Sequence, residues 1–287
     1  MVSLKVEDLR YKYPDGTRAL DGVSISVKGG EFLAILGANG SGKTTLLKHL
    51  NGLLTPESGS VILEGKKLSE HKPKEVFRKV GMVFQDPNDQ LLAPTVEEDV
   101  AFGPTNLDLQ HEEIMRRVEN ALELVQMSEY AKKTIQALSY GQRKRICIAG
   151  VLAMESEALI LDEPTSGLDP EGVKTVMKLL KDLNKRHGIT IIIATNSVDL
   201  VPVFMDRVAI MVNGRIVNAG IPEVVFTDSG KLEDVKLELP QIAQLMEALR
   251  DKDKLPLNSL PLTIGEARKE LVNLINVGTE ALISPEL

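Results

Sequence analysis

Hydrophobic residues along the chain follow patterns that predict both strands and helices. Residues 23–27 place an apolar side chain at every second position, which is typical of a half-buried strand. Residues 32–36 and 158–161 are apolar throughout, and residues 189–194 are interrupted by a single threonine. Runs without a polar face are typical of the centre of a parallel sheet that is covered on both sides. We therefore predict three buried strands at these places.

Helical patterns separate the buried strands. Residues 113–127 and 171–185 read as helices, and Pro14, Asp15 and Gly16 read as a turn. Strands that alternate with helices in this way predict an α/β core.

The pattern changes after Asp228, where two amphipathic helices are predicted. The first places Ile242, Leu245, Met246 and Leu249 on one face, and the second places Ala267, Leu271, Leu274 and Ile275 on one face. The second helix begins with a capping box formed by Thr263 and Glu266, and residues 250–261 link the two helices. A segment this short cannot build its own core, so we expect it to pack on the main domain or on a second copy.

Composition and charge narrow the class of protein. The chain has 287 residues, of which 43% are hydrophobic and 26% charged, which is typical of a globular protein. Its net charge of −7 argues against nucleic acid as the main partner. A single cysteine, Cys147, excludes an internal disulfide. We see neither a signal peptide nor a run of about 20 apolar residues, so we expect no membrane insertion and only a peripheral membrane role.

A glycine-rich loop follows the strand at 32–36 and precedes an apolar helical run, which is the setting of a P-loop. Its backbone N–H groups and the helix N-terminus are suited to holding phosphates. We expect Lys43 to reach the β- and γ-phosphates and the Thr44 hydroxyl to hold Mg²⁺. The predicted ATP-binding residues of this segment are Gly37, Ala38, Asn39, Gly40, Ser41, Gly42, Lys43, Thr44 and Thr45.

Two acidic residues end the second buried strand. Asp162 falls at the carboxyl end of a central strand, where open α/β sheets bind ligands, and it suits the coordination sphere of Mg²⁺. Glu163 is the candidate to orient or deprotonate an attacking water. An acidic residue after a strand, seen alone, is a helix cap about as often as it is a functional residue. A P-loop in the same chain favours catalysis.

Further motifs resemble those of ATP-binding cassette proteins. Residues 138–142 resemble the signature motif, and residues 164–169 resemble the D-loop. Gln85, after the apolar residues 81–84, matches the Q-loop glutamine, and Tyr13 matches the aromatic residue that stacks on adenine. The motifs keep the family's order from residue 13 to residue 169, and the resemblance extends to about residue 222. The residues singled out in the signature and D-loop are Ser139, Tyr140, Gly141, Gln142, Ser166 and Asp169.

The resemblance implies a P-loop NTPase core with an antiparallel β-subdomain, a helical subdomain and a small C-terminal helical extension. The ATPase domain would span residues 1–228, with the helical subdomain at about 86–150, and the extension would span 229–287. ATP and Mg²⁺ would be the cofactors, with Thr44, Gln85 and Asp162 at the metal. The signature residues would act on the ATP of a partner, so that two chains close two sites head to tail.

The chain departs from the family at two positions. Tyr140 stands where the signature usually has glycine, and Asn196 stands where the family has a switch histidine. Asparagine can donate a hydrogen bond to phosphate but cannot carry a proton or a positive charge. We therefore predict intact ATP binding and slow hydrolysis, unless a partner supplies a complete second site. The predicted catalytic residues are Lys43, Gln85, Glu163 and Asn196.

Residues 84–92, 95–103 and 149–154 are similar to ATPase subunits of cobalt importers and of energy-coupling-factor vitamin importers. The tail, with Leu239-Pro240 and residues 260–263, resembles a dimerisation element of that group, although its helices could instead merely cap the fold. The helical subdomain would receive a coupling helix of a membrane permease. The acidic residues 97–99 would meet basic residues there or form a solvated face.

The leading hypothesis is the ATPase of a cobalt-type importer at the cytoplasmic face of the cell membrane, acting as a homodimer or heterodimer. A vitamin-importer ATPase in a heterodimer is the alternative within the class. A non-transport cassette protein is disfavoured, because such proteins carry long coiled-coil insertions or two cassettes. A non-catalytic ATP-gated clamp is motivated by Asn196 and opposed by Glu163.

Overall fold

The computed structural model describes residues 1–226, 237–257 and 259–283. These residues form two compact units, one of residues 1–196 with 209–218 and the other of residues 197–208 with the described part of 219–287. The domain boundary predicted at residue 228 lies outside the described residues, and the predicted division at this point stays a prediction.

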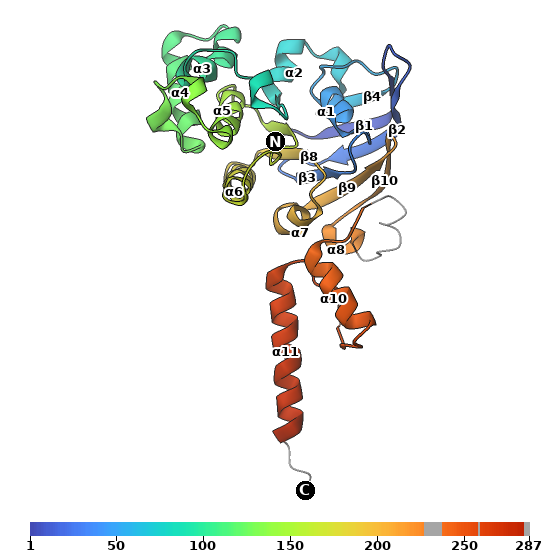
Figure 1. Cartoon of the computed structure of the whole chain (residues 1–287). Coiled ribbons are helices and arrows are strands. Elements are labelled where there is room, and N and C mark those ends of the chain that lie inside the picture. Colours follow the sequence, from blue (N-terminus) through green and yellow to red (C-terminus); the bar gives the residue numbers. More distant parts are fainter. Residues whose placement is uncertain (227–236, 258, 284–287) are drawn as a thin grey trace. The chain divides into compact units, whose positions relative to one another are not determined.

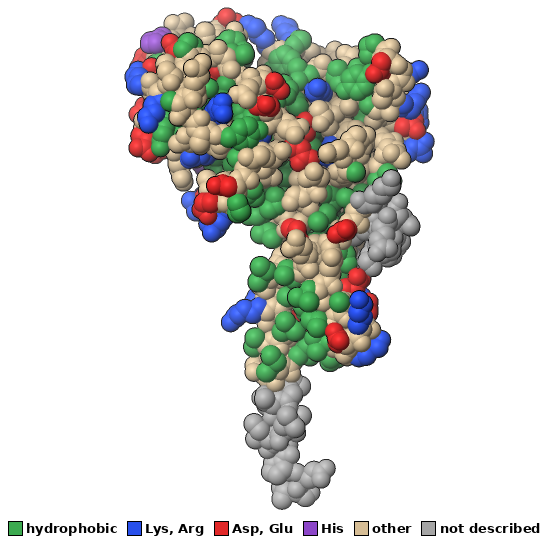
Figure 2. Space-filling model, in the orientation of Figure 1, with side chains coloured by type: hydrophobic (Ala, Val, Ile, Leu, Met, Phe, Trp, Pro, Cys, Tyr) green, Lys and Arg blue, Asp and Glu red, His purple; other side chains and the backbone are tan. Residues whose placement is uncertain are grey.

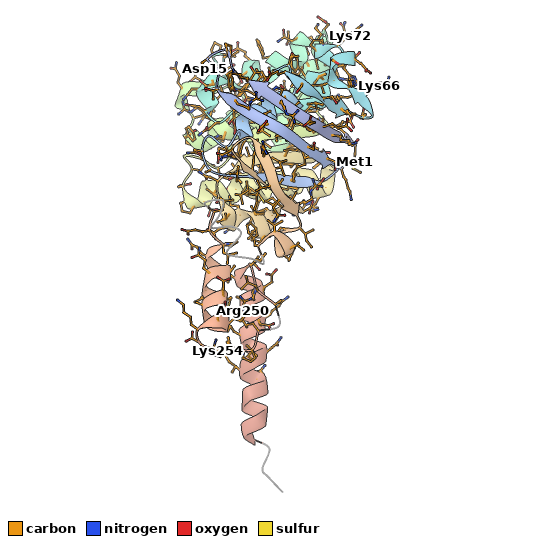
Figure 3. All side chains as sticks on the ribbon, turned by 90° about the vertical axis from the view of Figure 1, so that its right-hand side faces the viewer. Met1, Asp15, Lys66, Lys72, Arg250 and Lys254 are labelled. Carbon is orange, nitrogen blue, oxygen red and sulfur yellow. The ribbon has the colours of Figure 1, made fainter. Side chains whose placement is uncertain are left out.

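An antiparallel sheet opens the first unit (Figure 1). In β2, Val23, Ile25 and Val27 are buried and the serines between them are exposed, as the alternating pattern predicts. The predicted turn joins β1 to β2, and its Asp15 lies at the tip of the hairpin (Figure 3), where its side chain accepts a hydrogen bond from the Thr17 amide at 2.9 Å. The strand order is β2-β1-β4-β5, with β1 (Leu4–Lys12), β2 (Arg18–Val27), β4 (Ser58–Leu63) and β5 (Lys66–Lys67).

The second sheet contains the three predicted buried strands, in which every residue is buried. The strand at 32–36 has the predicted bounds, and the other two differ from the prediction by about one residue. Neighbouring strands β3, β8, β7 and β6 are parallel. The order is β10-β9-β3-β8-β7-β6, with β3 (Phe32–Leu36), β6 (Val80–Val83), β7 (Ala158–Asp162), β8 (Thr190–Thr195), β9 (Arg207–Val212) and β10 (Arg215–Gly220).

Helices complete the first unit. The helix α1 packs on β2, β7 and β8, so it lies between the two sheets, while α3, α4 and α5 pack on one another as a helical subdomain (Figure 1). The predicted helices at 113–127 and 171–185 are α4 and α6. The helices are α1 (Lys43–Leu50), α2 (Pro73–Lys79), α3 (Val96–Asn106), α4 (His111–Leu124), α5 (Tyr140–Leu152) and α6 (Pro170–His187). Short 3₁₀ turns occur at Leu68–Glu70, Pro87–Asp89, Ser128–Tyr130 and Ile135–Ala137. The predicted α/β fold with an antiparallel sheet and a helical subdomain is confirmed.

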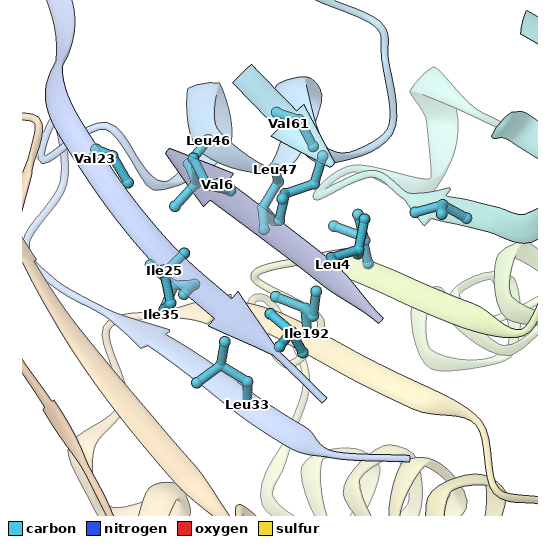
Figure 4. Close-up of a cluster of buried hydrophobic side chains, with 14 of the residues drawn as sticks. Leu4, Val6, Val23, Ile25, Leu33, Ile35, Leu46, Leu47, Val61 and Ile192 are labelled. Atoms are coloured by element: carbon cyan, nitrogen blue, oxygen red, sulfur yellow. The ribbon is translucent and has the colours of Figure 1, made fainter. Parts of the chain in front are cut away.

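A buried hydrophobic cluster joins the two sheets through α1 (Figure 4). Leu33 and Ile35 of β3 lie in it together with Leu46 and Leu47 of α1, and all four are fully buried. Burying a side chain of this size stabilises the fold by about 1.5–3 kcal/mol. Because both flanks of the P-loop belong to this core, the loop between them is anchored at each end.

The second unit is helical. It contains a 3₁₀ turn (Val198–Leu200), α7 (Val201–Phe204), α8 (Pro222–Val225), α10 (Gln241–Asp251) and α11 (Ile264–Ile283). The Asp199 carboxylate accepts a hydrogen bond from the Gln241 amide at 2.7 Å and so satisfies the start of α10. Within the described residues, every helix of the chain falls short of the length and hydrophobicity that crossing a membrane requires.

The predicted apolar faces of the two C-terminal helices are only partly right. In α10 the most buried residues are Met246 and Ala243, while the predicted Leu245 is 54% exposed. In α11 the capping box is present, since the Thr263 hydroxyl accepts from the Glu266 amide at 3.3 Å, but Ile275 is 64% exposed. Ala243 is fully buried instead, and α10 contacts α11. Hydrophobic side chains are therefore left on the surface of these helices (Figure 2).

Candidate active site

Four of the predicted segments leave the parallel sheet at the same edge. The register pairs Leu36 with Thr195, Asp162 with Ala194 and Val83 with Leu161. Because these strands run parallel, the P-loop after β3, the residue after β8, the acidic pair at the end of β7 and the Q-loop after β6 meet at one side. The structure thus brings the predicted catalytic residues to one edge of the sheet.

The P-loop holds its lysine against its own backbone. The Lys43 side chain is 6% exposed, and its Nζ donates to the carbonyl oxygens of Gly37 at 2.8 Å and Ala38 at 3.2 Å. Gly42 has φ 106°, and a Cβ there would lie 2.5 Å from the Ala19 oxygen. At Gly40 the Cβ position has no neighbour within 4 Å among the described residues. The loop is therefore closely packed against the protein at Gly42 and open at Gly40, which leaves room for a phosphate at its backbone N–H groups.

Glu163 lies beside Lys43 at the end of β7. Its Oε1 is 3.6 Å from Nζ, which is too long for a hydrogen bond and defines an ion pair between two mostly buried side chains. Burial raises the pKa of Glu163, while Lys43 and the Asn196 amide lower it. Its backbone has φ 42°, a left-handed conformation that is uncommon for glutamate and is typical of functional sites. Asn196 itself is exposed at the end of β8.

The residues predicted at the metal suit Mg²⁺. Asp162 is 4% exposed, and its Oδ1 has no hydrogen-bond partner among the described residues. A buried carboxylate oxygen without a partner is costly, and a cation would satisfy it. Thr44 and Gln85 are exposed, so both side chains are accessible to a bound ion.

Tyr13 reaches the helix that follows the P-loop. Its hydroxyl lies 3.1 Å from the Thr45 hydroxyl. The Tyr13 ring meets the Tyr11 ring edge-on at 5.0 Å, and Tyr11 in turn meets the buried His49 at 4.7 Å. The antiparallel sheet therefore places the predicted adenine-stacking residue beside the phosphate loop.

The signature residues form the start of α5. The Ser139 hydroxyl accepts from the Gln142 amide at 3.2 Å, and the Gln142 side chain accepts from the Ser139 amide at 2.9 Å, so Ser139 is a helix cap. The same residues, with Tyr140 and Gly141, line a hollow of about 460 Å³ whose other wall includes Asp169 of the D-loop. No described P-loop residue lines this hollow.

The D-loop connects the acidic pair to α6. The Ser166 amide donates to the Glu163 carbonyl at 3.1 Å, which closes the turn after β7. The Asp169 side chain accepts from the Gly172 amide at 2.8 Å and caps α6. Signature and D-loop therefore share one surface of the chain.

The acidic residues 97–99 were predicted to form a solvated face or to meet a partner, and neither describes Asp99. It is 9% exposed and accepts from the amides of Leu92 and Ala93 at 2.7 and 2.9 Å. Burial raises its pKa. Glu98 closes a capping box with Thr95, while Glu97 pairs with Lys132 at 2.6 Å. Asp99 is held inside because the bend before α3 leaves two amides that need an acceptor.

Two residues near the site escaped the sequence reasoning. Lys144 is 1% exposed, and its ammonium donates to the carbonyl oxygens of Gln85 and Glu163. Gln90 accepts from the Phe84 amide at 3.0 Å and donates to the Cys147 carbonyl at 3.1 Å, which fixes the Q-loop to α5. The available signal for Lys144 was its position one helical turn after Tyr140.

The fold is that of an ATP-binding cassette, and the chain belongs to the ABC transporter family, whose sequence profile matches residues 20–166. It is an ATPase whose hydrolysis is coupled to transport, of the energy-coupling-factor and CbiO type. The energy-coupling factor transporter ATP-binding protein EcfA of Methanocaldococcus jannaschii is 49% identical over 277 residues, covering 96% of this chain and 99% of the relative.

Two solved structures are similar as well. The structure of cbiO1 from Clostridium perfringens, part of the ABC transporter complex cbiONQ, is 47% identical with a TM-score of 0.74 and covers 85% of this chain and 98% of that one. A dimeric post-hydrolysis state of the ATP-binding cassette MJ0796, bound to ADP and Pi, is 28% identical with a TM-score of 0.68 and covers 76% of this chain and 98% of that one.

Proposed function

We propose that this ATPase energises the uptake of cobalt or a related transition metal ion by a membrane complex. The observation that carries the proposal is the similarity to cbiO1, which spans nearly the whole of that chain and comes from a structure described as part of the cbiONQ transporter complex. The sequence of the Q-loop region, residues 84–92, supports the same group.

In the proposed mechanism Lys43 exchanges its backbone partners for phosphate oxygens. Its ammonium now donates to two P-loop carbonyls and faces Glu163, so a triphosphate offers it stronger, charged acceptors. The ionised Glu163 then orients the attacking water and accepts its proton. Thr44, Gln85 and Asp162 would hold Mg²⁺, which when bound would neutralise charge on the phosphates.

We further propose that two cassettes act together. Each chain carries one P-loop and one signature hollow, and the D-loop lies beside the signature. The similarity to a dimeric cassette with ADP and Pi supports the pairing of two cassettes. The second cassette is either another copy of this chain or a related subunit.

The proposed membrane partner would dock on the helical subdomain. An apolar groove of about 310 Å³ is lined by Phe77, Phe84, Leu92, Phe102 and Met154, and Leu92 and Phe102 are 70% and 54% exposed. Exposed apolar side chains that gather in a groove are typical of a protein interface. We therefore propose that this groove binds a coupling helix of a permease. Binding there would hold the chain at the cytoplasmic face of the membrane.

An energy-coupling-factor vitamin importer is the second candidate, because EcfA of M. jannaschii is nearly as long as this chain and half identical to it. The two candidates are separated by co-expressing the chain with each type of membrane subunit and measuring ATP-dependent uptake of ⁵⁷Co²⁺ or of a labelled vitamin in vesicles. Metal uptake that disappears in Glu163→Gln would support the leading proposal. Uptake of vitamin alone would replace it.

The non-catalytic clamp considered from the sequence does not fit a member of a family of ATPases whose hydrolysis is coupled to transport. Steady-state phosphate release by the wild-type complex, abolished in Glu163→Gln, is the expected result.

A further inference from the structure

One face of α5 connects the signature motif to the Q-loop. Tyr140 and Lys144 lie one turn apart on this face, and the ammonium is 5.8 Å from the centre of the tyrosine ring. Both side chains donate to the same acceptor, the carbonyl oxygen of Gln85, with a distance of 3.5 Å from the tyrosine hydroxyl. The backbone of the Q-loop is therefore bonded to the helix that begins at the signature.

Lys144 also reaches the acidic pair. Its Nζ lies 3.5 Å from the carbonyl oxygen of Glu163, so one buried ammonium bridges the backbones of Gln85 and Glu163. The acceptors that the structure gives this ammonium are carbonyls and not carboxylates. A buried charge without a directly bonded counter-ion costs stability, so packing alone does not account for a lysine in a place where an apolar side chain of similar length would also fit.

Tyr140 extends these contacts to the D-loop. A Cβ built on Gly167 would lie 3.1 Å from the tyrosine ring, so the ring packs directly on the D-loop backbone. Arg143, whose guanidinium is 6.0 Å from the same ring, donates to the Asn88 side chain of the Q-loop at 3.0 Å. The first two turns of α5 thus touch both loops that flank the proposed hydrolysis site.

We propose that Lys144, assisted by Tyr140, is a positioning residue that fixes the backbones of Gln85 and Glu163 relative to the signature helix. When the signature closes on the nucleotide of the partner cassette, the pair transmits that movement to the metal and water groups of its own site. The inference rests on the proposed roles of Glu163 and Gln85. It also gives a function to Tyr140, where the family usually has glycine.

The test is Lys144→Met in the full chain. Misplacing a catalytic group by about 1 Å costs about 10- to 100-fold in rate, so kcat should fall by that factor. The dissociation constant of a fluorescent ATP analogue should stay within about 2-fold, because the P-loop is untouched. The melting temperature should not fall, since the variant removes a buried charge. Lys144→Arg, which restores a cation, should recover part of kcat.

Lys79→Met is the matched control. Lys79 comes just before β6, at the edge of the sheet opposite the site, and it pairs with Glu64. Its loss should lower the melting temperature slightly and leave kcat unchanged.

Two outcomes would overturn the inference. One is an unchanged kcat in Lys144→Met. The other is a fall in kcat together with weaker ATP binding and a lower melting temperature, which would indicate a structural role. Glu163→Gln separates this failure from failure of the proposed function. If Glu163→Gln keeps wild-type hydrolysis, the proposed site itself is wrong.

Discussion

Glu163 combines burial, a neighbouring cation and a left-handed backbone in one residue. Burial disfavours the charged form of its carboxylate and Lys43 favours it, while a φ of 42° is uncommon for a glutamate. A carboxylate whose proton affinity is raised is better suited to accept a proton from water.

The first prediction is the pH dependence of hydrolysis. Because burial raises the pKa of Glu163 and the base must be ionised, kcat should rise as the pH passes through that raised value. The acid limb of kcat at saturating ATP should therefore lie above the ordinary glutamate value of about 4.3. A rate that stays constant down to about pH 4.5 would contradict this. Melting curves at each pH provide the control for unfolding.

A second prediction concerns Asn196, which is exposed at the end of β8. An asparagine there can donate one hydrogen bond but cannot carry a charge, and loss of such a contact typically costs about 10²-fold in kcat. Asn196→His should therefore raise steady-state phosphate release, by about 10-fold or more. The same substitution in a Glu163→Gln background should raise nothing. An unchanged rate in the single variant would refute the idea that Asn196 limits hydrolysis.

Among the elements, the connection between β3 and α1 provides the loop of the proposed phosphate site. The apolar side chains of both flanks are buried in one cluster, while the loop between them turns back on the chain at Gly42. The loop therefore keeps its shape before a nucleotide arrives.

The third prediction concerns the glycines in the loop that connects β3 to α1. Gly42→Ala places a Cβ 2.5 Å from the Ala19 oxygen at φ 106°, whereas Gly40→Ala meets no described atom within 4 Å and has φ 79°. Gly40→Ala should cost about 1–2 kcal/mol for the left-handed conformation alone. Gly42→Ala should cost clearly more, about 2–4 kcal/mol in all, because the clash adds to the strain. Urea unfolding without nucleotide measures the free energy of unfolding of both variants. Equal losses would contradict the prediction, because they would show that the backbone around the Ala19 oxygen yields to the new Cβ.

At the scale of the whole molecule, the phosphate loop and the signature motif lie apart in one chain, since no described P-loop residue lines the hollow beside Ser139. In the proposed pairing, the P-loop and Glu163 of one cassette and the signature of another would complete each site. On that proposal, hydrolysis depends on association of two cassettes.

A fourth prediction tests this association. Glu163→Gln should bind ATP without consuming it, so ATP should shift the protein to twice its monomer mass in light scattering after size exclusion. If the working pair is heteromeric, the shift should require the sister subunit. Lys43→Ala should abolish the shift, since its P-loop lacks the phosphate ligand. If nucleotide never draws two cassettes together in Glu163→Gln, the head-to-tail interpretation is wrong.

The strand at 32–36 has the predicted bounds because an apolar run with glycines after it permits little else. The predicted apolar face of α10 was only partly right, since Ala243 is buried and Leu245 is exposed. Which side of a short amphipathic helix is covered depends on how it packs in the folded unit. The prediction for the acidic residues 97–99 was wrong for Asp99, because the sequence does not reveal which backbone amides lack an acceptor.

By itself, the sequence determined the α/β class, the P-loop and the order of the motifs, because each depends on local periodicity or on residues adjacent in the chain. Only the tertiary structure decided that Lys43 and Glu163 form an ion pair and that Lys144 bridges Gln85 and Glu163. Those contacts join residues on different strands and helices. They depend on distances of a few ångströms, which the packing of the sheet and of α5 sets and which no local pattern encodes.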